Sequence, residues 1–551
     1  MLAAMLVPQL LAQRSATPEP LGGTYEPAFP PLSNNYPLTE DSKPQPGVPK
    51  GECFQFQITD SKVFPNTTHT ITVYVPAAYK TDRPAVVWVK LDGLDGPLLT
   101  TLDNLIARHE IPVTVAVGVS PGTVASERGD ENPRLQRSFE FDGQSDRLAR
   151  FLSEEVLPAV EAHTTPSGKP IHLSHDPNDR AIAGGSTGGI AAFTAAFLRP
   201  DLFRRVYSTI GTFVGMRGGE QLYVTVRKTE PRPIRVFLND GANDEWMGGP
   251  EMGDWHMANL TMNRALEFAG YDVNHVWGQG SHSGAQAEQI MPDVLRWLFR
   301  DYPQPIVAKI PGNPRLAEIL VDGQEWQPAA AVPGLTTVAG PRRAEYTMQP
   351  AGGFRAGSGA VVAANLAIRA LTVRANGDVY AAVRSEHGTS ELWRIAADGK
   401  ETKLDGGLHG ATALAFSPDG LWLLVADGTG QHAYDYRVSR DGAIDAREPM
   451  YQFAIQPTAE DSGATALCFD TQGRLYAATR MGVEIFDRNG RVTGILRAPA
   501  AEALTGLTFG GDDMRILFIQ TANGKVFSRR VKATGVPADA EPIHLTKGSA
   551  G

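Results

Sequence analysis

Residues 180–190 of this chain read RAIAGGSTGGI, and this stretch decides the fold of the first half. The apolar run at 180–183 is typical of a buried strand, and the small residues from Gly188 onward are typical of a closely packed helix. Between them, the pattern G-x-S-x-G places Ser186 on a sharp strand-to-helix turn. Glycines flank the serine because larger side chains would clash with the neighbouring backbone. The stretch therefore predicts an exposed nucleophilic hydroxyl at the edge of a sheet.

Strands and helices alternate on both sides of this turn. Apolar runs at 85–89 and 112–117 enclose a helical stripe of leucine and isoleucine at 98–109, which indicates a strand–helix–strand crossover. The alternation then continues towards Tyr302. We expect further helices at 147–160, 190–198, 257–269 and 290–299, and further strands at 54–58, 70–75, 234–238 and 272–277. Together these elements predict one α/β-hydrolase domain over residues 51–302.

The periodicity and composition of the sequence change after Tyr302. Prolines mark a linker at 303–318, and beyond it a unit of short strands recurs without helical periodicity. The repeats align on Leu371, Leu414, Leu467 and Leu507, which are 43, 53 and 40 residues apart. A period near 40 residues predicts a β-propeller over residues 319–551, and we expect six blades. A β-sandwich with regular hairpins is the alternative for this half.

Composition limits the possible partners and the compartment. The chain has 551 residues, a formal net charge of −10 and two cysteines, so we expect neither nucleic acid nor an anionic membrane surface as partner, and no disulfide framework. Residues 1–13 are apolar and resemble the core of a secretory signal, and the proline-rich stretch up to residue 50 is typical of a leader. We therefore expect a secreted or periplasmic protein.

A catalytic acid and a histidine follow the nucleophile along the chain in folds of this kind. Asp244 lies in the loop after the strand at 234–238 and is the first choice for the acid, with Asp240 second and Glu245 third. His282 lies in a loop of glycine and serine after the last strand and is the first choice for the base. Its competitors are His275, inside that strand, and His256, near a helix start.

This set of residues predicts acyl transfer through a covalent ester on Ser186. The oxyanion of the tetrahedral intermediate needs two backbone donors. We expect the N–H of Thr187 as one, and that of Gly93 or Leu94 as the other. Two tryptophans flank the acid loop and are candidates for stacking on a sugar ring, with ordinary packing as the alternative. They are Trp246 and Trp255.

The first half resembles the putative-esterase family, which includes enterochelin, feruloyl and acetylxylan esterases and mycolyltransferases. The resemblance rests on short stretches at residues 72–76, 90–93, 137–140, 151–158, 184–189 and 280–282. It covers about residues 50 to 302, and it implies cleavage of esters of sugars, siderophores or hydroxycinnamates without a metal cofactor.

The second half resembles the gluconolactonase/regucalcin-like propellers, on residues 415–420 and 507–511. Those enzymes hold a divalent metal at the propeller centre through carboxylate and amide oxygens, as a hard cation requires. Where that family has Asn or Asp, this chain has Thr412 and Thr465. We therefore expect no metal site and no cofactor.

The sequence thus predicts a serine esterase acting through Ser186, His282 and Asp244, with the propeller as an accessory binding domain. The expected substrate is a carbohydrate-linked ester, such as an ester of a plant polysaccharide or another glycoside. The alternative is a metal-dependent sugar lactonase centred on the propeller.

Overall fold

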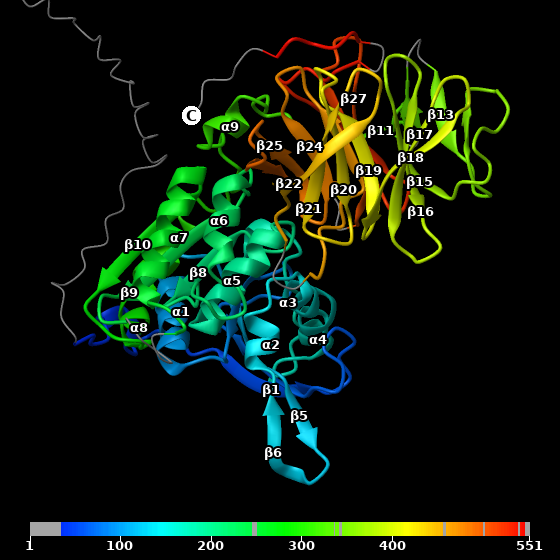
Figure 1. The fold of residues 1–551 in the computed structure, drawn as a ribbon. Coiled ribbons are helices and arrows are strands. Elements are labelled where there is room, and N and C mark those ends of the chain that lie inside the picture. Colours follow the sequence, from blue (N-terminus) through cyan, green and yellow to red (C-terminus); the bar gives the residue numbers. More distant parts are fainter. Residues whose placement is uncertain are drawn as a thin grey trace, which may run out of the picture.

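A computed structural model describes residues 35–244, 251–335, 337–340, 344–455, 459–499, 502–537 and 540–545. The chain forms an α/β domain and a β-propeller that lie side by side (Figure 1). The signal-like segment expected at 1–13 lies outside the described residues. Among the described helices, none is both long enough and apolar enough to cross a membrane.

The α/β domain is built on an eight-stranded sheet of order β1-β2-β4-β3-β7-β8-β9-β10. Its first three strands pair antiparallel and the others run parallel, as apolar strands joined by crossover helices do. The strands are β1 (Glu52–Ile58), β2 (His69–Val75), β3 (Val86–Leu91), β4 (Thr114–Val119), β7 (Arg180–Gly185), β8 (Arg205–Thr209), β9 (Arg235–Gly241) and β10 (Asp272–Gly278).

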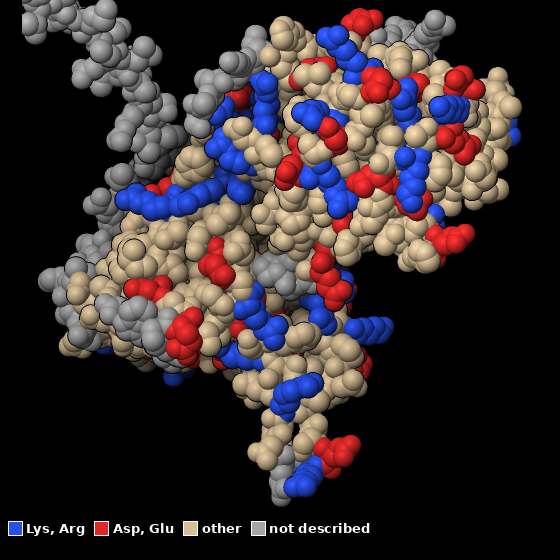
Figure 2. All heavy atoms as spheres, viewed as in Figure 1, with Lys and Arg blue, Asp and Glu red and all other residues tan. Residues whose placement is uncertain are grey.

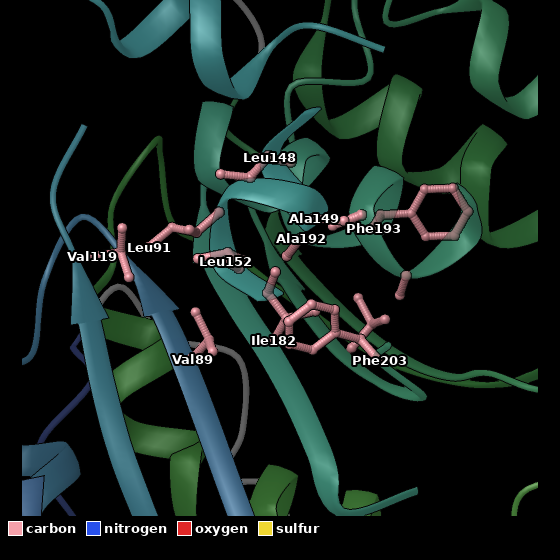
Figure 3. Packing of buried hydrophobic residues seen from close by; sticks show 14 of the residues in the cluster. Val89, Leu91, Val119, Leu148, Ala149, Leu152, Ile182, Ala192, Phe193 and Phe203 are labelled. Atoms are coloured by element: carbon pink, nitrogen blue, oxygen red, sulfur yellow. The ribbon is translucent and has the colours of Figure 1, made fainter. Parts of the chain in front are cut away.

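Helices cover both faces of this sheet because both faces are apolar. One face packs against α1 (Gly96–Ala107) and α8 (Ala285–Phe299). The other packs against α5 (Thr187–Leu198), α7 (Trp255–Ala269) and a helical segment between 147 and 162. Figure 3 shows this second face, where Val89, Ile182 and Phe193 are buried together. The helix expected at 147–160 is divided into α3 (Arg147–Arg150), a π-helical turn (Phe151–Val156) and α4 (Leu157–Ala162).

The α/β domain also contains several smaller elements. A hairpin projects from it, away from the propeller (Figure 1), and leads into a short helix. The smaller elements of this domain are β5 (Thr123–Ser126), β6 (Gly129–Leu135), α2 (Arg137–Phe141), α6 (Gln221–Lys228) and the 3-10 turns Glu40–Ser42 and Pro177–Asp179. The short helix α9 (Pro314–Ala317) follows in the linker, and its Leu316 is buried in the propeller core.

The second half is a propeller of five blades, so the expectation of six blades is wrong. The described residues form one three-stranded and four four-stranded sheets. The first strand, β11 (Gln327–Ala329), pairs with β29 (Val526–Arg530) and completes the last blade instead of starting another. The roughly 200 residues that remain hold five blades at about 40 residues each.

The predicted repeats fall on the inner strands of four blades, β15, β19, β23 and β27, which lie next to one another around the centre. The remaining propeller strands are β12 (Val338–Ala339), β13 (Glu345–Met348), β14 (Phe354–Ala356), β15 (Ile368–Val373), β16 (Val379–Arg384), β17 (Ser390–Ile395), β18 (Glu401–Leu408), β19 (Ala411–Phe416), β20 (Trp422–Asp427), β21 (His432–Val438), β22 (Ile444–Gln452), β23 (Ala466–Phe469), β24 (Leu475–Thr479), β25 (Gly482–Phe486), β26 (Val492–Leu496), β27 (Leu504–Gly510) and β28 (Ile516–Thr521).

The two domains join through a buried ion pair. Glu230, just after α6, accepts a hydrogen bond from the Arg529 guanidinium on β29 at 2.7 Å, and these side chains are only 10% and 4% exposed. The backbone N–H of Arg497 donates to the other carboxylate oxygen of Glu230 at 3.2 Å. The Arg497 guanidinium lies 4.8 Å from the ring centroid of Phe197 on α5. A charge buried in this way depends on its partner.

We therefore expect Arg529→Met to lower the free energy of unfolding by about 3–5 kcal/mol, because it removes the guanidinium that donates to the buried Glu230 carboxylate. Chemical denaturation measures the change. Arg530→Met is the matched control: Arg530 pairs with Asp513 on the surface, where both side chains are nearly half exposed, and a pair of that kind contributes about 0–1 kcal/mol. Equal effects of the two substitutions would show that the Glu230–Arg529 pair does not hold the junction together.

Candidate functional site

Ser186 lies on the turn between β7 and α5 with φ 55°, a conformation that non-glycine residues rarely adopt. The flanking glycines make this turn possible. A Cβ on Gly184 would lie 2.3 Å from the carbonyl oxygen of Gly188, closer than atoms can approach. The strand and the helix can therefore meet at this turn only because residue 184 has no side chain, and the turn presents the Ser186 hydroxyl at its tip.

A continuous hydrogen-bond chain runs from this hydroxyl to a buried carboxylate. The Nε2 atom of His282 lies 2.8 Å from Ser186 Oγ, and the Nδ1 atom of His282 lies 2.8 Å from Asp244 Oδ2. The His282 side chain is 12% exposed and that of Asp244 is 1% exposed. This arrangement allows the imidazole to accept a proton from the serine while the carboxylate fixes its tautomer.

The loops that carry the acid and the histidine are bonded to each other. The N–H groups of Ala242 and Asn243 donate to the carbonyls of Gly278 and Gly280, at 2.9 and 3.0 Å. The approach is so close that a Cβ on Gly241 would lie 2.1 Å from the Gly280 carbonyl oxygen. This backbone contact fixes the position of Asp244 relative to that of His282.

Asp240, the second choice for the acid, has a different place in the site. It is fully buried at the end of β9, where its carboxyl oxygens accept from the N–H of Gly241 at 2.7 Å and from the Asn259 amide at 2.8 Å. Burial first, and then the neighbouring Asp244, raise the pKa of Asp240 far above its ordinary value. Burial thus favours the uncharged form of Asp240, beside the acid that contacts the histidine. The third choice, Glu245, lies outside the described residues.

The two competing histidines pack against Trp277. The ring of His275 is stacked on it with centroids 4.8 Å apart, and burial lowers the pKa of His275. The ring of His256 meets the same tryptophan edge-on at 6.0 Å. Of the three candidate histidines, His282 is the one that the structure brings to Ser186.

The residues expected to supply the oxyanion donors lie on two segments next to the nucleophile. Thr187 is the first residue of α5, and the loop with Gly93 and Leu94 follows β3. Arg137 ties this loop to the turn: it donates to both oxygens of Asp92, at 2.8 and 2.7 Å, and to the Gly185 carbonyl at 3.2 Å. Hydrogen bonding to Asp92 raises the pKa of Arg137. The loop and the nucleophile turn are thus held side by side.

Thr212 is a contact of the nucleophile that the sequence did not predict. Its hydroxyl lies 3.3 Å from Ser186 Oγ and accepts a hydrogen bond from the Trp255 indole N–H at 3.3 Å. Trp255 is only 2% exposed, and its ring meets the imidazole of His282 edge-on at 5.6 Å. This burial favours packing over stacking on a sugar. The other proposed stacking residue, Trp246, lies outside the described residues.

The two threonines that replace expected metal ligands have other partners in the propeller. Thr412 donates to the Ala464 carbonyl at 2.6 Å, and Thr465 donates to the Leu504 carbonyl at 2.9 Å, so each hydroxyl links neighbouring blades. Within the part of the chain that the structure describes, no group of three or more His, Cys, Asp or Glu side chains is placed to hold a metal. A cavity of about 850 Å³ lies at the other ends of the inner strands, beside Phe416, Phe469 and Phe509.

Comparison with known families divides the chain in the same way. Residues 61–298 match the model of the family described as putative esterase. Residues 363–523 match the model described as SMP-30/Gluconolactonase/LRE-like region. The chain therefore carries an esterase-family region followed by a gluconolactonase-like region.

Curated relatives align over 25–31% of this chain. A 6-deoxy-6-sulfogluconolactonase of Pseudomonas putida is 28% identical over 169 residues, 28% of this chain and 56% of that protein. The uncharacterized protein YbbA of Bacillus subtilis is 22% identical over 182 residues, 31% of this chain and 68% of that protein. The chain thus spans about half the length of the first of these relatives.

Solved structures are similar to one half of the chain at a time. The match to the enterobactin esterase FES from Shigella flexneri covers 47% of this chain and 62% of the FES chain, with 19% identity and a TM-score of 0.36. The match to a ferulic acid esterase covers 45% of this chain and 99% of the esterase chain, with 17% identity and a TM-score of 0.33. The match to a gluconolactonase-family protein covers 41% of this chain and 98% of that protein's chain, with 17% identity and a TM-score of 0.32.

Proposed function

We propose that this chain, whose residues 61–298 belong to the putative-esterase family, is a serine hydrolase of carboxylic esters. The observation that carries the proposal is the hydrogen-bond chain from Asp244 through His282 to Ser186, which is half-buried on a turn with positive φ. A serine so placed is activated by its histidine, and the family match independently points to ester hydrolysis.

The reaction follows from the positions of these three side chains. As Ser186 Oγ attacks the ester carbonyl carbon, its proton passes to His282 Nε2, and Asp244 stabilises the resulting imidazolium. The C–O bond to the alcohol then breaks, and the imidazolium protonates the leaving alcohol. Water, deprotonated by the same imidazole, attacks the acyl-serine ester, releasing the acid and restoring the Ser186 hydroxyl.

The backbone supplies the electrostatic stabilisation. The N–H of Thr187 and that of Gly93 or Leu94 would donate to the oxyanion that forms on the carbonyl oxygen in each half-reaction. Arg137 supports this arrangement by holding the Asp92 loop against Gly185. Donors fixed in this way need no reorganisation as the charge develops.

For the substrate we propose a carbohydrate-linked ester, of a plant polysaccharide or another glycoside, with the propeller as a binding domain. The support is the union of an esterase-family region with a region that matches gluconolactonases in sequence. A net charge of −10 disfavours nucleic acid and anionic membranes as partners. For the same protein we propose a secreted or periplasmic location, on the signal-like pattern of residues 1–13.

The second candidate is a metal-dependent lactonase in the propeller, which the match over 363–523 favours. Against it stand the hydroxyls of Thr412 and Thr465, which are neutral, weak ligands and are hydrogen-bonded to neighbouring blades.

We expect hydrolysis of a small aryl ester to be unchanged after dialysis against a chelator and to be lost in Ser186→Ala. Rates measured with and without added Ca²⁺ or Zn²⁺ check this. Lactone turnover that is lost on chelation and unaffected by Ser186→Ala would establish the lactonase instead.

A further inference from the structure

A pocket of about 490 Å³ lies at the base of the β5–β6 hairpin, and three arginines line it. Arg134 comes from the end of β6, Arg147 from the start of α3, and Arg217 from the loop between β8 and α6. Among the described lining residues none is Asp or Glu, and many are apolar. Figure 2 shows Lys and Arg side chains gathered on the face around the base of this hairpin.

Two of these arginines are held in place by their surroundings. The Arg147 guanidinium lies 5.1 Å from the ring centroids of both Phe64 and Phe139 and donates to the Val63 carbonyl at 2.9 Å. Arg217 donates from Nε to the Ser138 hydroxyl at 3.3 Å. A planar guanidinium fixed by such contacts loses little further freedom when it binds an anion with its remaining N–H groups.

The three guanidinium groups form no ion pair with any carboxylate that the structure describes, whereas Arg137 is paired with Asp92. Arg217 interacts through space with Asp142. Burial is the largest influence on that carboxyl and raises its pKa. Cations concentrated in a concave, partly apolar pocket attract an anion and bind it through charge-assisted hydrogen bonds.

The pocket is joined to the nucleophile turn through α2. Gln136 and Ser138, which line the pocket, stand on either side of Arg137, and Arg137 donates to the carbonyl of Gly185, the residue before the nucleophile. Asp142, which follows α2, is buried, and its backbone N–H donates to the Ser138 carbonyl at 3.1 Å. The segment 136–141 thus lines the pocket on one side and supports the nucleophile turn on the other.

We propose that this pocket binds an oxyanion carried by the substrate, so that the protein prefers esters with a carboxylate, sulfate or phosphate at the end of an apolar spacer. The inference rests on the proposed ester hydrolysis and narrows its substrate class. The three guanidinium groups bind the oxyanion, and the apolar spacer packs on Leu135 and Phe139, which are 60% and 45% exposed.

The first test compares 4-nitrophenyl monoesters of dicarboxylic acids of increasing chain length with their neutral methyl diesters. The wild type should show a higher kcat/KM for the anionic ester at one spacer length, and added salt should reduce that preference. In Arg134→Gln and in Arg217→Gln the anionic-to-neutral ratio should fall about 10- to 100-fold, as expected when a hydrogen bond to a charged group is lost. Arg128→Gln is the matched control, because Arg128 lies on the same hairpin outside the pocket and its substitution should leave the ratio unchanged.

The second test measures binding without catalysis. Calorimetry on Ser186→Ala with the half-anilide of the preferred dicarboxylic acid should show binding that weakens with Arg217→Gln and disappears with the methyl-capped ligand. The same spacer ending in sulfate or phosphate distinguishes the kind of oxyanion. Equal kcat/KM for anionic and neutral esters at every length, or an equal fall of the ratio in Arg128→Gln, would overturn the proposal. If no ester is hydrolysed, the proposed function fails, and calorimetry with the half-anilides of every chain length still decides whether the pocket binds anions: binding at no length overturns the proposal.

Discussion

Replacing Ser186 by alanine is expected to lower kcat for a small aryl ester on the order of a million-fold, leaving only the modest acceleration that oxyanion donors and binding provide. The reason is chemical: without Oγ there is no acyl-enzyme, and His282 can act only on water. The Ser186 side chain contacts His282 and Thr212 through polar atoms, so its loss removes little packing. Steady-state kinetics on purified protein, corrected for the uncatalysed rate, measure the effect.

Ser281→Ala is the control for this substitution. Ser281 is exposed and precedes His282 in the same loop, so its loss tests whether any serine near the imidazole matters. We expect near wild-type kcat for Ser281→Ala, and unchanged thermal unfolding for both variants. An Ser186→Ala protein that keeps near wild-type turnover would remove Ser186 from the mechanism.

Replacing Asp244 by asparagine is expected to lower kcat about 10⁴-fold with the fold intact. An amide at this position can donate to Nδ1 of His282, which forces the proton onto Nε2, the atom that must accept from Ser186 at 2.8 Å. The imidazolium that forms in the transition state also loses its carboxylate partner. The kinetic effect should appear in kcat more than in KM, since Asp244 lies behind the histidine.

Asp240→Asn is the matched control, because Asp240 stands four residues away in the same buried cluster. Burial and the neighbouring Asp244 raise the pKa of Asp240 and favour its uncharged form, so a neutral amide is a close replacement in charge, and its single oxygen keeps the bond from Gly241 or the one from Asn259. We expect a far smaller loss of kcat than in Asp244→Asn. Equal losses would mean that the two carboxyl groups share the role assigned to Asp244.

Local sequence was sufficient for the fold of the first half. The turn at Ser186 needs the pattern of glycines that the sequence shows, because a side chain at Gly184 would collide with the Gly188 carbonyl. Alternating apolar strands and helices predict the parallel sheet, since each strand is buried on both faces. Chain order then points to loops carrying Asp244 and His282, and the structure brings both to Ser186.

Features made by long-range contacts could not be predicted in this way. The number of blades depends on β11 pairing with β29, about 200 residues later, and no local pattern shows this pairing. Thr212 reaches Ser186 from a loop with no motif, and Asp240 differs from Asp244 only through burial and neighbours. The ion pair of Glu230 and Arg529 likewise links residues that are distant in sequence.

The arginine pocket has the same origin. Arg134, Arg147 and Arg217 are separated by tens of residues and lie on a strand end, a helix start and a loop. In the sequence they are three ordinary cations among 51 Lys and Arg residues, and only the fold places them around one cavity, where none of them forms an ion pair with a described carboxylate. A specificity of this kind becomes visible once side chains have positions.

The central claim, that Ser186 is the nucleophile of an ester hydrolase, is tested most directly by covalent labelling with a fluorophosphonate probe followed by peptide mass mapping. A fluorophosphonate reacts with a serine that an adjacent base activates, forming a stable adduct on the oxygen that would carry the acyl group. The account predicts one equivalent of label on Ser186, loss of ester hydrolysis in proportion to labelling, and no labelling in Ser186→Ala or His282→Ala. Ester hydrolysis that persists after complete labelling of Ser186, or stoichiometric label on another residue, would contradict it.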